Sequence, residues 1–261
     1  CFQNGKEVVI LDRPNPLGGL KVDGPPLEAH WQSYVGAFQV PYVHGLTIGE
    51  LARMAVSKPG ILNITEPQRR SGALKVVTME NWNRYMSWPQ TGLRWVPTSP
   101  FIPDFESVVG YPMTGLGAQL GGFKHGIGSE FPFRCLRYDG VDIDRLLAEL
   151  EACRIPGIAF TKKKTSQGTG LYVRVTDWQK WRPTELSFYM MQLTAKFEGS
   201  NPFAAASDSQ ANLFNKHTGS TSWWNELVAK GARANVNGYI TLWQRQAKQF
   251  QIESRRYWLY D

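Results

Sequence analysis

Residues Lys6 to Gly19 read Lys6-Glu-Val-Val-Ile-Leu-Asp-Arg-Pro-Asn-Pro-Leu-Gly-Gly19, an apolar run that leads directly into a proline-rich turn. The residues Val8 to Leu11 are mostly β-branched and show no polar alternation, which is the pattern of a strand buried on both faces of a parallel sheet. Two prolines then fix the backbone on either side of Asn15. Because ligands bind at the carboxyl ends of strands in open α/β sheets, we predict a binding site at the Asp12–Asn15 turn, with an ordinary solvated loop as the alternative.

The first strand also raises a question about its neighbours. It follows Cys1 by only a few residues, and the segment Cys1–Gly5 resembles the last turn of a helix with a glycine cap. A buried parallel strand needs partners on both edges, and the later predicted strands are too few to build a central sheet of usual size around it. We therefore expect an upstream segment, or a companion chain carrying it, to pair with this strand and to bring a carboxylate to the turn.

Composition indicates a globular protein. The 261 residues are 42% hydrophobic, enough to bury one large core or two modest ones. The formal net charge of +7 favours polyanionic partners such as nucleic acid, anionic lipid or an anionic cell-wall polymer. No zinc-finger or other nucleic-acid motif accompanies the densest basic run, Lys162–Lys164, which is predicted to be a solvated loop. No apolar run approaches the length of a membrane-spanning helix, so neither nucleic acid nor a membrane span is expected.

The spacing of the apolar residues and the positions of glycine, proline and capping residues predict a mixed α/β chain. An α/β domain with a parallel sheet, incomplete at its N-terminus, is expected over residues 1–196, and a smaller helical or α+β region over 197–261. Further strands are predicted at Leu74–Met79, Ile158–Phe160 and Leu171–Val175, and a short helix is predicted to start at Asp104. Other helices are predicted from Thr47 to before Pro59 and at Asp142–Ala152, Thr184–Phe197, Ser222–Lys230 and Ile240–Ser254.

Two residues are candidates for catalysis. His44 lies in a loop just before a predicted helix, although a single histidine is more often a structural hydrogen-bonding group. Glu130 follows the glycine-rich run Met113–Gly128 and is either a local carboxylate or a surface residue. Glu50 is discounted because it completes a capping box with Thr47. The glycine-rich run has no phosphate-loop pattern, so no nucleotide cofactor is expected.

The three cysteines, Cys1, Cys135 and Cys153, lack metal-ligand spacing, so no metal site is expected. Cys1 allows a separate hypothesis, in which cleavage frees an amino-terminal nucleophile and its own amine acts as the base of an amidase-type hydrolase. The alternative is that Cys1 marks a processing boundary without a catalytic role.

Several ordered motifs resemble one family along nearly the whole chain. They are Leu11-Asp-Arg-Pro-Asn-Pro-Leu-Gly-Gly19, Val22-Asp-Gly-Pro25, Ser33-Tyr-Val-Gly36, His44-Gly-Leu-Thr-Ile-Gly-Glu-Leu-Ala52, Thr91-Gly-Leu-Arg-Trp-Val96, Tyr111-Pro112 and the ending Arg256-Tyr-Trp-Leu-Tyr260. Together they are similar to the later part of the bacterial exo-β-N-acetylmuramidases of the NamZ type, long catalogued as a family of unknown function.

The resemblance implies that the α/β domain is Rossmann-like and that a smaller carboxy-terminal domain follows it. It also implies release of N-acetylmuramic acid from the non-reducing end of peptidoglycan fragments, and therefore action outside the cytoplasm, in the periplasm or after secretion. Predicted substrate-binding residues are Asp12, Arg13, Asn15 and Tyr111, and predicted catalytic residues are Glu130 and His44. Muramic acid carries a lactyl carboxylate, which the Arg13 guanidinium can hold in a bidentate fork.

Two departures from the family pattern bear on catalysis. The family's Pro-Glu-His-Gly and Asp-x-Gln-Asp motifs do not occur in this sequence, and the segment Gly126–Phe133 resembles a Gly-x-Gly-Thr segment with altered chemistry. Glycosidases generally need a carboxylic acid at the leaving oxygen and a second carboxylate across the sugar. Two alternatives therefore stand beside the glycosidase hypothesis, the amidase-type hydrolase that uses Cys1 and a non-catalytic cell-wall binding protein.

Overall fold

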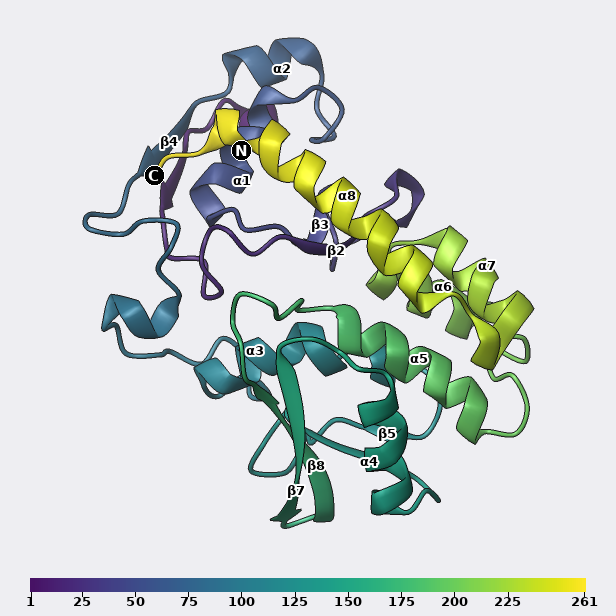
Figure 1. Cartoon of the computed structure of the whole chain (residues 1–261). Helices are drawn as coiled ribbons and strands as arrows, with labels where there is room; N and C mark the ends of the chain where they lie inside the picture. The colour runs from purple at the N-terminus through teal and green to yellow at the C-terminus, as the bar shows by residue number, and fades with distance from the viewer.

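The N-terminal region contains a short parallel sheet with a helical crossover. The computed structural model describes all residues from 1 to 261. Strand β1 (Val8–Leu11) pairs in parallel with β4 (Leu74–Val77), in the register Val8↔Leu74 to Leu11↔Val77. In the sequence, β1 and β4 are separated by the antiparallel strands β2 (Asp23–Pro26) and β3 (Pro41–Val43) and by the helices α1 (Ile48–Ser57) and α2 (Glu66–Ser71) (Figure 1). The predicted first strand, the strand predicted at Leu74–Met79 and the mixed α/β class are confirmed, although the second strand ends at Val77. That β4 is the parallel partner of β1 was not predicted.

The predicted burial of β1 on both faces is wrong. Val9 is 51% exposed and Leu11 is 71% exposed, whereas Val8 and Ile10 are half-buried. The reason is that α1 packs against the sheet while no element of this chain covers the side from which Val9 and Leu11 project. The edge of β1 opposite β4 also has no strand partner.

The other sheet is antiparallel. Its strands are β5 (Phe123–Lys124), β6 (Cys135–Tyr138), β7 (Ile158–Thr165) and β8 (Gly168–Val175), in the order β5-β6-β8-β7. The predicted strands at 158–160 and 171–175 are confirmed, but both are longer than predicted. Lys162–Lys164 do not form a loop, because they continue β7 and pair with Leu171 to Thr169 of β8.

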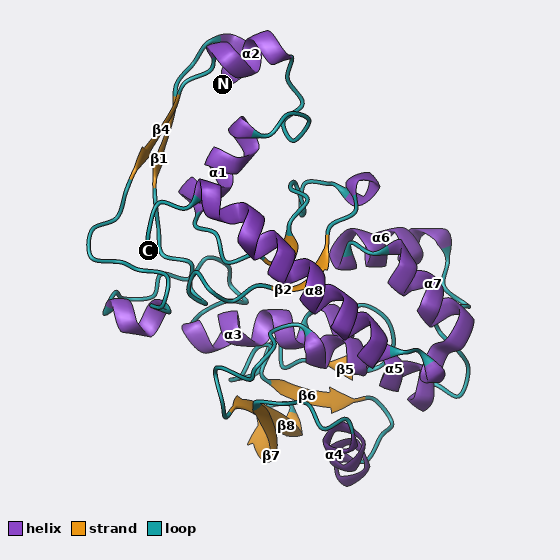
Figure 2. Cartoon of the chain, turned by 45° about the horizontal axis from the view of Figure 1, so that its top comes forward, coloured by secondary structure: helices purple, strands orange, loops and turns teal.

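Helices form the middle of the molecule. In both cartoon views α3 (Phe105–Thr114) and α5 (Glu185–Phe197) lie between the parallel pair and the antiparallel sheet (Figure 2). Helix α4 (Ile143–Ala152) packs on that sheet, and α6 (Asp208–Thr218), α7 (Thr221–Lys230) and α8 (Val236–Ser254) follow α5. The helices predicted at the places of α3, α4, α5, α7 and α8 are confirmed, whereas α6 was not predicted. No helix has the length and apolar character needed to cross a membrane.

One hydrophobic core of 28 buried residues runs from the first turn to the last helix. Its centre is aromatic: Trp223 is 0% exposed and meets Phe188 edge-on, with ring centroids 5.5 Å apart. From this core α8 crosses back over β2 to the parallel pair, so the chain closes beside its beginning (Figure 1). The segment Tyr257–Asp261 at the yellow end of α8 therefore lies against the ends of β1 and β4, next to the predicted binding turn.

Candidate substrate-binding cleft

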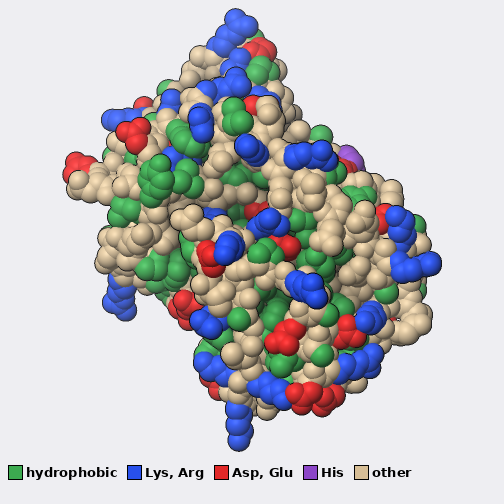
Figure 3. Space-filling model, in the orientation of Figure 1, with side chains coloured by type: hydrophobic (Ala, Val, Ile, Leu, Met, Phe, Trp, Pro, Cys, Tyr) green, Lys and Arg blue, Asp and Glu red, His purple; other side chains and the backbone are tan.

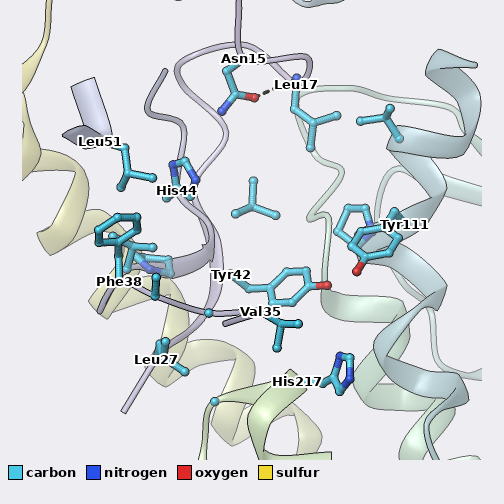
Figure 4. Close-up of a pocket in the computed structure, with 18 of the residues that line it drawn as sticks. Asn15, Leu17, Leu27, Val35, Phe38, Tyr42, His44, Leu51, Tyr111 and His217 are labelled. Atoms are coloured by element: carbon cyan, nitrogen blue, oxygen red, sulfur yellow. Dashed lines mark hydrogen bonds between the residues drawn. The ribbon is translucent and has the colours of Figure 1, made fainter. Parts of the chain in front are cut away.

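A cavity of about 590 Å³ lies behind the proline-rich turn. The turn residues Asn15 to Leu17 form one wall, the segment Val35–His44 forms a second, and Tyr111 of α3 faces them (Figure 4). The end of α6, with Lys216 and His217, closes the cavity. We call this cavity the tyrosine chamber, because Tyr42 and Tyr111 point into it.

A second cavity of about 600 Å³ adjoins the first. The two share Asn15, Pro16, His44, Leu51, Trp95 and Thr98, so they form one cleft with two chambers. Of these two cavities, only the second is lined by Arg13, Arg94 and Trp88. We call it the arginine chamber. His44 and Asn15 therefore lie at the junction, where a group bridging both chambers would pass.

The turn is held by Asn15. Its Nδ2 donates to the carbonyl oxygen of Leu46 at 3.0 Å, and its Oδ1 accepts from the backbone N–H of Leu17 at 3.1 Å. The side chain thus fixes the turn internally and ties it to the loop before α1, because asparagine supplies a donor and an acceptor together. Asn15 lies in the cleft as predicted, but its amide is already engaged.

Asp12 occupies a different position from its neighbours in the turn. It is 5% exposed and lines neither chamber. Its Oδ1 accepts from the backbone N–H groups of Gly49 and Arg13 at 2.8 and 3.0 Å. Its Oδ2 accepts from the hydroxyls of Thr47 and Tyr260, each at 2.7 Å. Four donors therefore hold this carboxylate, which anchors the turn to the body and does not face the cleft.

The cleft is electropositive and contains no carboxylate. Arg13 and Arg94 make no ion pair, and no Asp or Glu lines either chamber. Basic side chains are also spread over the face shown in Figure 3, in keeping with the net charge of +7. Two guanidiniums without counter-ions beside Trp88 and Trp95 form a site suited to an anionic ligand with an apolar face.

His44 is held as a neutral imidazole. Its Nδ1 accepts from the backbone N–H of Leu46 at 3.0 Å, so the ring proton belongs on Nε2. Burial lowers the pKa of His44 to about 4. At neutral pH this side chain therefore offers the cleft a hydrogen-bond donor and is a poor proton shuttle.

The half-buried histidines His44 and His125 should make stability depend on pH. Burial lowers the pKa values of both His44 and His125 to about 4, whereas an unfolded histidine titrates near 6.5. The unfolded state therefore binds more protons between these values, and the free energy of unfolding should fall as the pH drops from about 6.5 to about 4. Urea unfolding across this range measures the effect. His44→Asn and His125→Asn should flatten the dependence, and the exposed control His30→Asn should not. A free energy that stays constant across the range in the wild type contradicts this assignment.

Tyr111, a predicted substrate-binding residue, lines the tyrosine chamber. Its ring packs edge-on against Phe133 with centroids 5.0 Å apart, and 43% of the residue is exposed. Burial and the neighbouring Tyr111 raise the pKa of Tyr42 well above its usual value. The Tyr42 phenol therefore keeps its proton. Both side chains present hydroxyl groups to a ligand (Figure 4).

The structure does not bring Glu130 to the cleft. Its carboxylate lies beside the β7–β8 turn, where it accepts from the backbone N–H of Ser166 at 3.1 Å. Its own backbone N–H, followed by the contacts with Ser166, lowers the pKa of Glu130. A general acid needs a raised pKa, so both place and charge state disfavour the predicted catalytic role.

The remaining sequence-based expectations concern Cys1 and a metal site, and some residues that line the cleft were not predicted. Cys1 is exposed and lines neither chamber. No cluster of His, Cys, Asp and Glu side chains suits a metal ion. Sequence reasoning missed Arg94, Lys216 and His217. Arg94 lies within the quoted motif Thr91–Val96 and could have been found, whereas α6 reaches the cleft only through tertiary packing.

The fold and the cleft define an α/β protein with a basic, aromatic-lined ligand site near the carboxyl end of a parallel strand. The family descriptions that match are "Exo-beta-N-acetylmuramidase NamZ, N-terminal" over residues 1–106 and "Exo-beta-N-acetylmuramidase NamZ, C-terminal" over residues 109–260. The chain belongs to the NamZ family.

Individual relatives agree with this assignment. The peptidoglycan beta-N-acetylmuramidase NamZ of Bacillus subtilis (strain 168) is 29% identical over 269 residues, covering 99% of this chain and 60% of that protein. The chain thus spans about 60% of the length of the curated relative it matches. A crystal structure of a DUF1343 family protein from Bacteroides fragilis superposes with a TM-score of 0.85 at 32% identity, covering 99% of this chain and 67% of that one. A second such B. fragilis protein, at 22% identity and a TM-score of 0.68, shares the fold.

Proposed function

We propose that this protein functions as a glycoside hydrolase outside the cytoplasm, where it releases N-acetylmuramic acid from the non-reducing end of peptidoglycan fragments. The observation that carries the proposal is the arginine chamber, where Arg13 and Arg94 have no counter-ion and no carboxylate is present. The lactyl carboxylate distinguishes muramic acid from other amino sugars of peptidoglycan. It supplies the missing negative charge, and guanidinium groups bind carboxylates through paired hydrogen bonds.

The remaining groups fit the parts of a disaccharide. Trp88 and Trp95 give the arginine chamber flat apolar surfaces for a sugar face. The tyrosine chamber then takes the second sugar, with the hydroxyl groups of Tyr42 and Tyr111 as hydrogen-bonding partners. His44 at the junction would donate from Nε2 to an oxygen near the glycosidic bond, where charge develops in the transition state.

The catalytic carboxylate is proposed to come from a further segment. Neither chamber contains Asp or Glu, yet glycoside hydrolysis generally uses two carboxyl groups. The open edge of β1 and the exposed Val9 and Leu11 beside the turn suit a strand from such a segment, whether covalently attached or a companion chain. Pairing there would place its residues next to Arg13.

Arg13→Ala tests the proposal. The dissociation constant for N-acetylmuramic acid should rise about 10-fold or more, because a charge-assisted pair is lost, while that for N-acetylglucosamine should change little. Isothermal titration calorimetry on both sugars measures this difference. Arg233→Ala, at an exposed position outside the cleft, is the matched control. An equal loss for both sugars would show that Arg13 is structural.

Turnover is tested by release of muramic acid from a short disaccharide. The assay should use a form that also carries the remaining length of the curated relative, because the proposed site takes its carboxylate from such a segment. Absence of product from that form would refute the hydrolase proposal.

A second candidate is a cell-wall binding protein without catalysis. The absence of carboxylates from both chambers favours it specifically. Saturable binding of muropeptides without any turnover would support this candidate, and clear turnover would exclude it.

A further inference from the structure

The segment Tyr257–Asp261 reaches the cleft's supports from the far end of the chain. The hydroxyl of Tyr260 donates to Asp12 Oδ2 at 2.7 Å and accepts from the backbone N–H of Met79 at 3.0 Å. It thereby joins the ends of the two parallel strands, since Asp12 follows β1 and Met79 lies two residues beyond β4. Burial and the nearby Asp12 and Glu50 carboxylates raise the pKa of Tyr260, so the phenol keeps the proton that it donates.

Asp12 connects Tyr260 to two walls of the arginine chamber, the turn at Arg13 and the start of α1. Its Oδ1 accepts from the backbone N–H of Arg13, which sets the direction in which that residue leaves the strand. Both oxygens also hold the start of α1, through the Gly49 N–H and the Thr47 hydroxyl. Thr47 follows Leu46, whose N–H fixes the His44 ring.

The segment Tyr257–Asp261 also forms hydrogen bonds with two residues of α1, Glu50 and Arg53. The backbone N–H of Leu259 donates to Glu50 Oε1 at 2.9 Å. Arg53 Nη1 donates to the carbonyl oxygens of Tyr257 and Trp258, each at 3.1 Å. Because Glu50 also accepts from the backbone N–H of Thr47, these contacts converge on the loop that carries His44.

We infer that Tyr260 is a positioning residue, which through Asp12 sets the geometry of Arg13 and of the His44 loop for an acidic sugar. The inference rests on the proposed function for its ligand, and the restraint itself rests on the hydrogen bonds alone. Tyr260 lines neither chamber, so it acts only through its neighbours.

The test compares Tyr260→Phe with Tyr257→Phe in the full chain. Tyr257 lies on the same segment and its hydroxyl makes no hydrogen bond, so it is a matched control. Tyr260→Phe should raise the dissociation constant for N-acetylmuramic acid about 10-fold and that for N-acetylglucosamine less than threefold. A merely structural role would weaken both sugars equally, and that result overturns the inference.

Amide hydrogen exchange separates this inference from the proposed function. Tyr260→Phe should speed exchange at the Arg13 and Gly49 amides relative to the wild type, and Tyr257→Phe should not. In an Asp12→Asn background the added Tyr260→Phe change should have little further effect. Unchanged exchange in Tyr260→Phe overturns the restraint, whatever the sugars show. If the wild type binds both sugars equally, the proposed ligand is refuted. The exchange measurement then still decides whether Tyr260 restrains the Arg13 turn.

Discussion

Replacing Arg84 by Met should lower the free energy of unfolding by about 3–5 kcal/mol, because it leaves a buried carboxylate without its partner. Arg84 is 1% exposed and Glu50 is 0% exposed, and Arg84 Nη1 lies 2.5 Å from Glu50 Oε1. Arg84 Nη2 also donates to the carbonyl oxygens of Gly19 and Gly45, at 3.1 and 2.7 Å. Its guanidinium stacks on Trp258, with Cζ 3.7 Å from the ring centroid. Urea unfolding monitored by tryptophan fluorescence gives the difference.

Two companion variants sharpen this measurement. Arg233→Met, at an exposed position, should change the free energy of unfolding by less than about 0.5 kcal/mol. Adding Glu50→Leu to Arg84→Met should restore part of the loss, because the unpaired charge is then removed as well. A loss below about 1 kcal/mol in Arg84→Met would show that Glu50 finds another partner.

Replacing His44 by Ala should lower kcat about 10²–10³-fold in the form of the protein that turns over disaccharide, because one oriented donor is lost at the junction of the chambers. His44→Asn is the informative comparison, since its side-chain oxygen can still accept from Leu46, while its amide N–H lies one bond short of the position of the Nε2 donor. It should be as inactive as His44→Ala but better folded. Since the pKa of His44 is about 4, the wild-type rate should show no histidine limb near pH 6.5. A kcat within threefold of wild type would remove His44 from the mechanism.

The local signals in the sequence predicted local structure well. β-Branched residues marked β1, and the Thr47–Glu50 capping box marked the start of α1, because both patterns act within a few residues. Burial of β1 was mispredicted because periodicity reports what a strand can bury and not whether a neighbouring element covers it. The lysine run was mispredicted because both faces of this part of the hairpin are exposed, so consecutive strand positions tolerate charge as readily as a loop does.

The cleft was predictable only in part, for a similar reason. The turn residues Arg13 and Asn15 follow a recognisable strand, and they do line the cleft. Asp12 follows the same strand, but its four donors include Tyr260, and no local pattern reveals so distant a partner. Glu130 looked chemically suitable by residue type alone, whereas its place beside Ser166 depends on how the β7–β8 hairpin folds back.

The contact between Asp12 and Tyr260 spans 248 positions of the chain. During synthesis on a ribosome, the N-terminal residues leave the exit tunnel long before residue 260 does, and domains start to fold as they emerge. Closing so long a loop carries an entropic cost that is offset only once both ends are present. A nascent chain can therefore form β1, β4 and α1 early, but it cannot lock the Arg13 turn until translation has passed Tyr260. Sugar-binding competence would then appear late, after the segment Tyr257–Asp261 has emerged and docked.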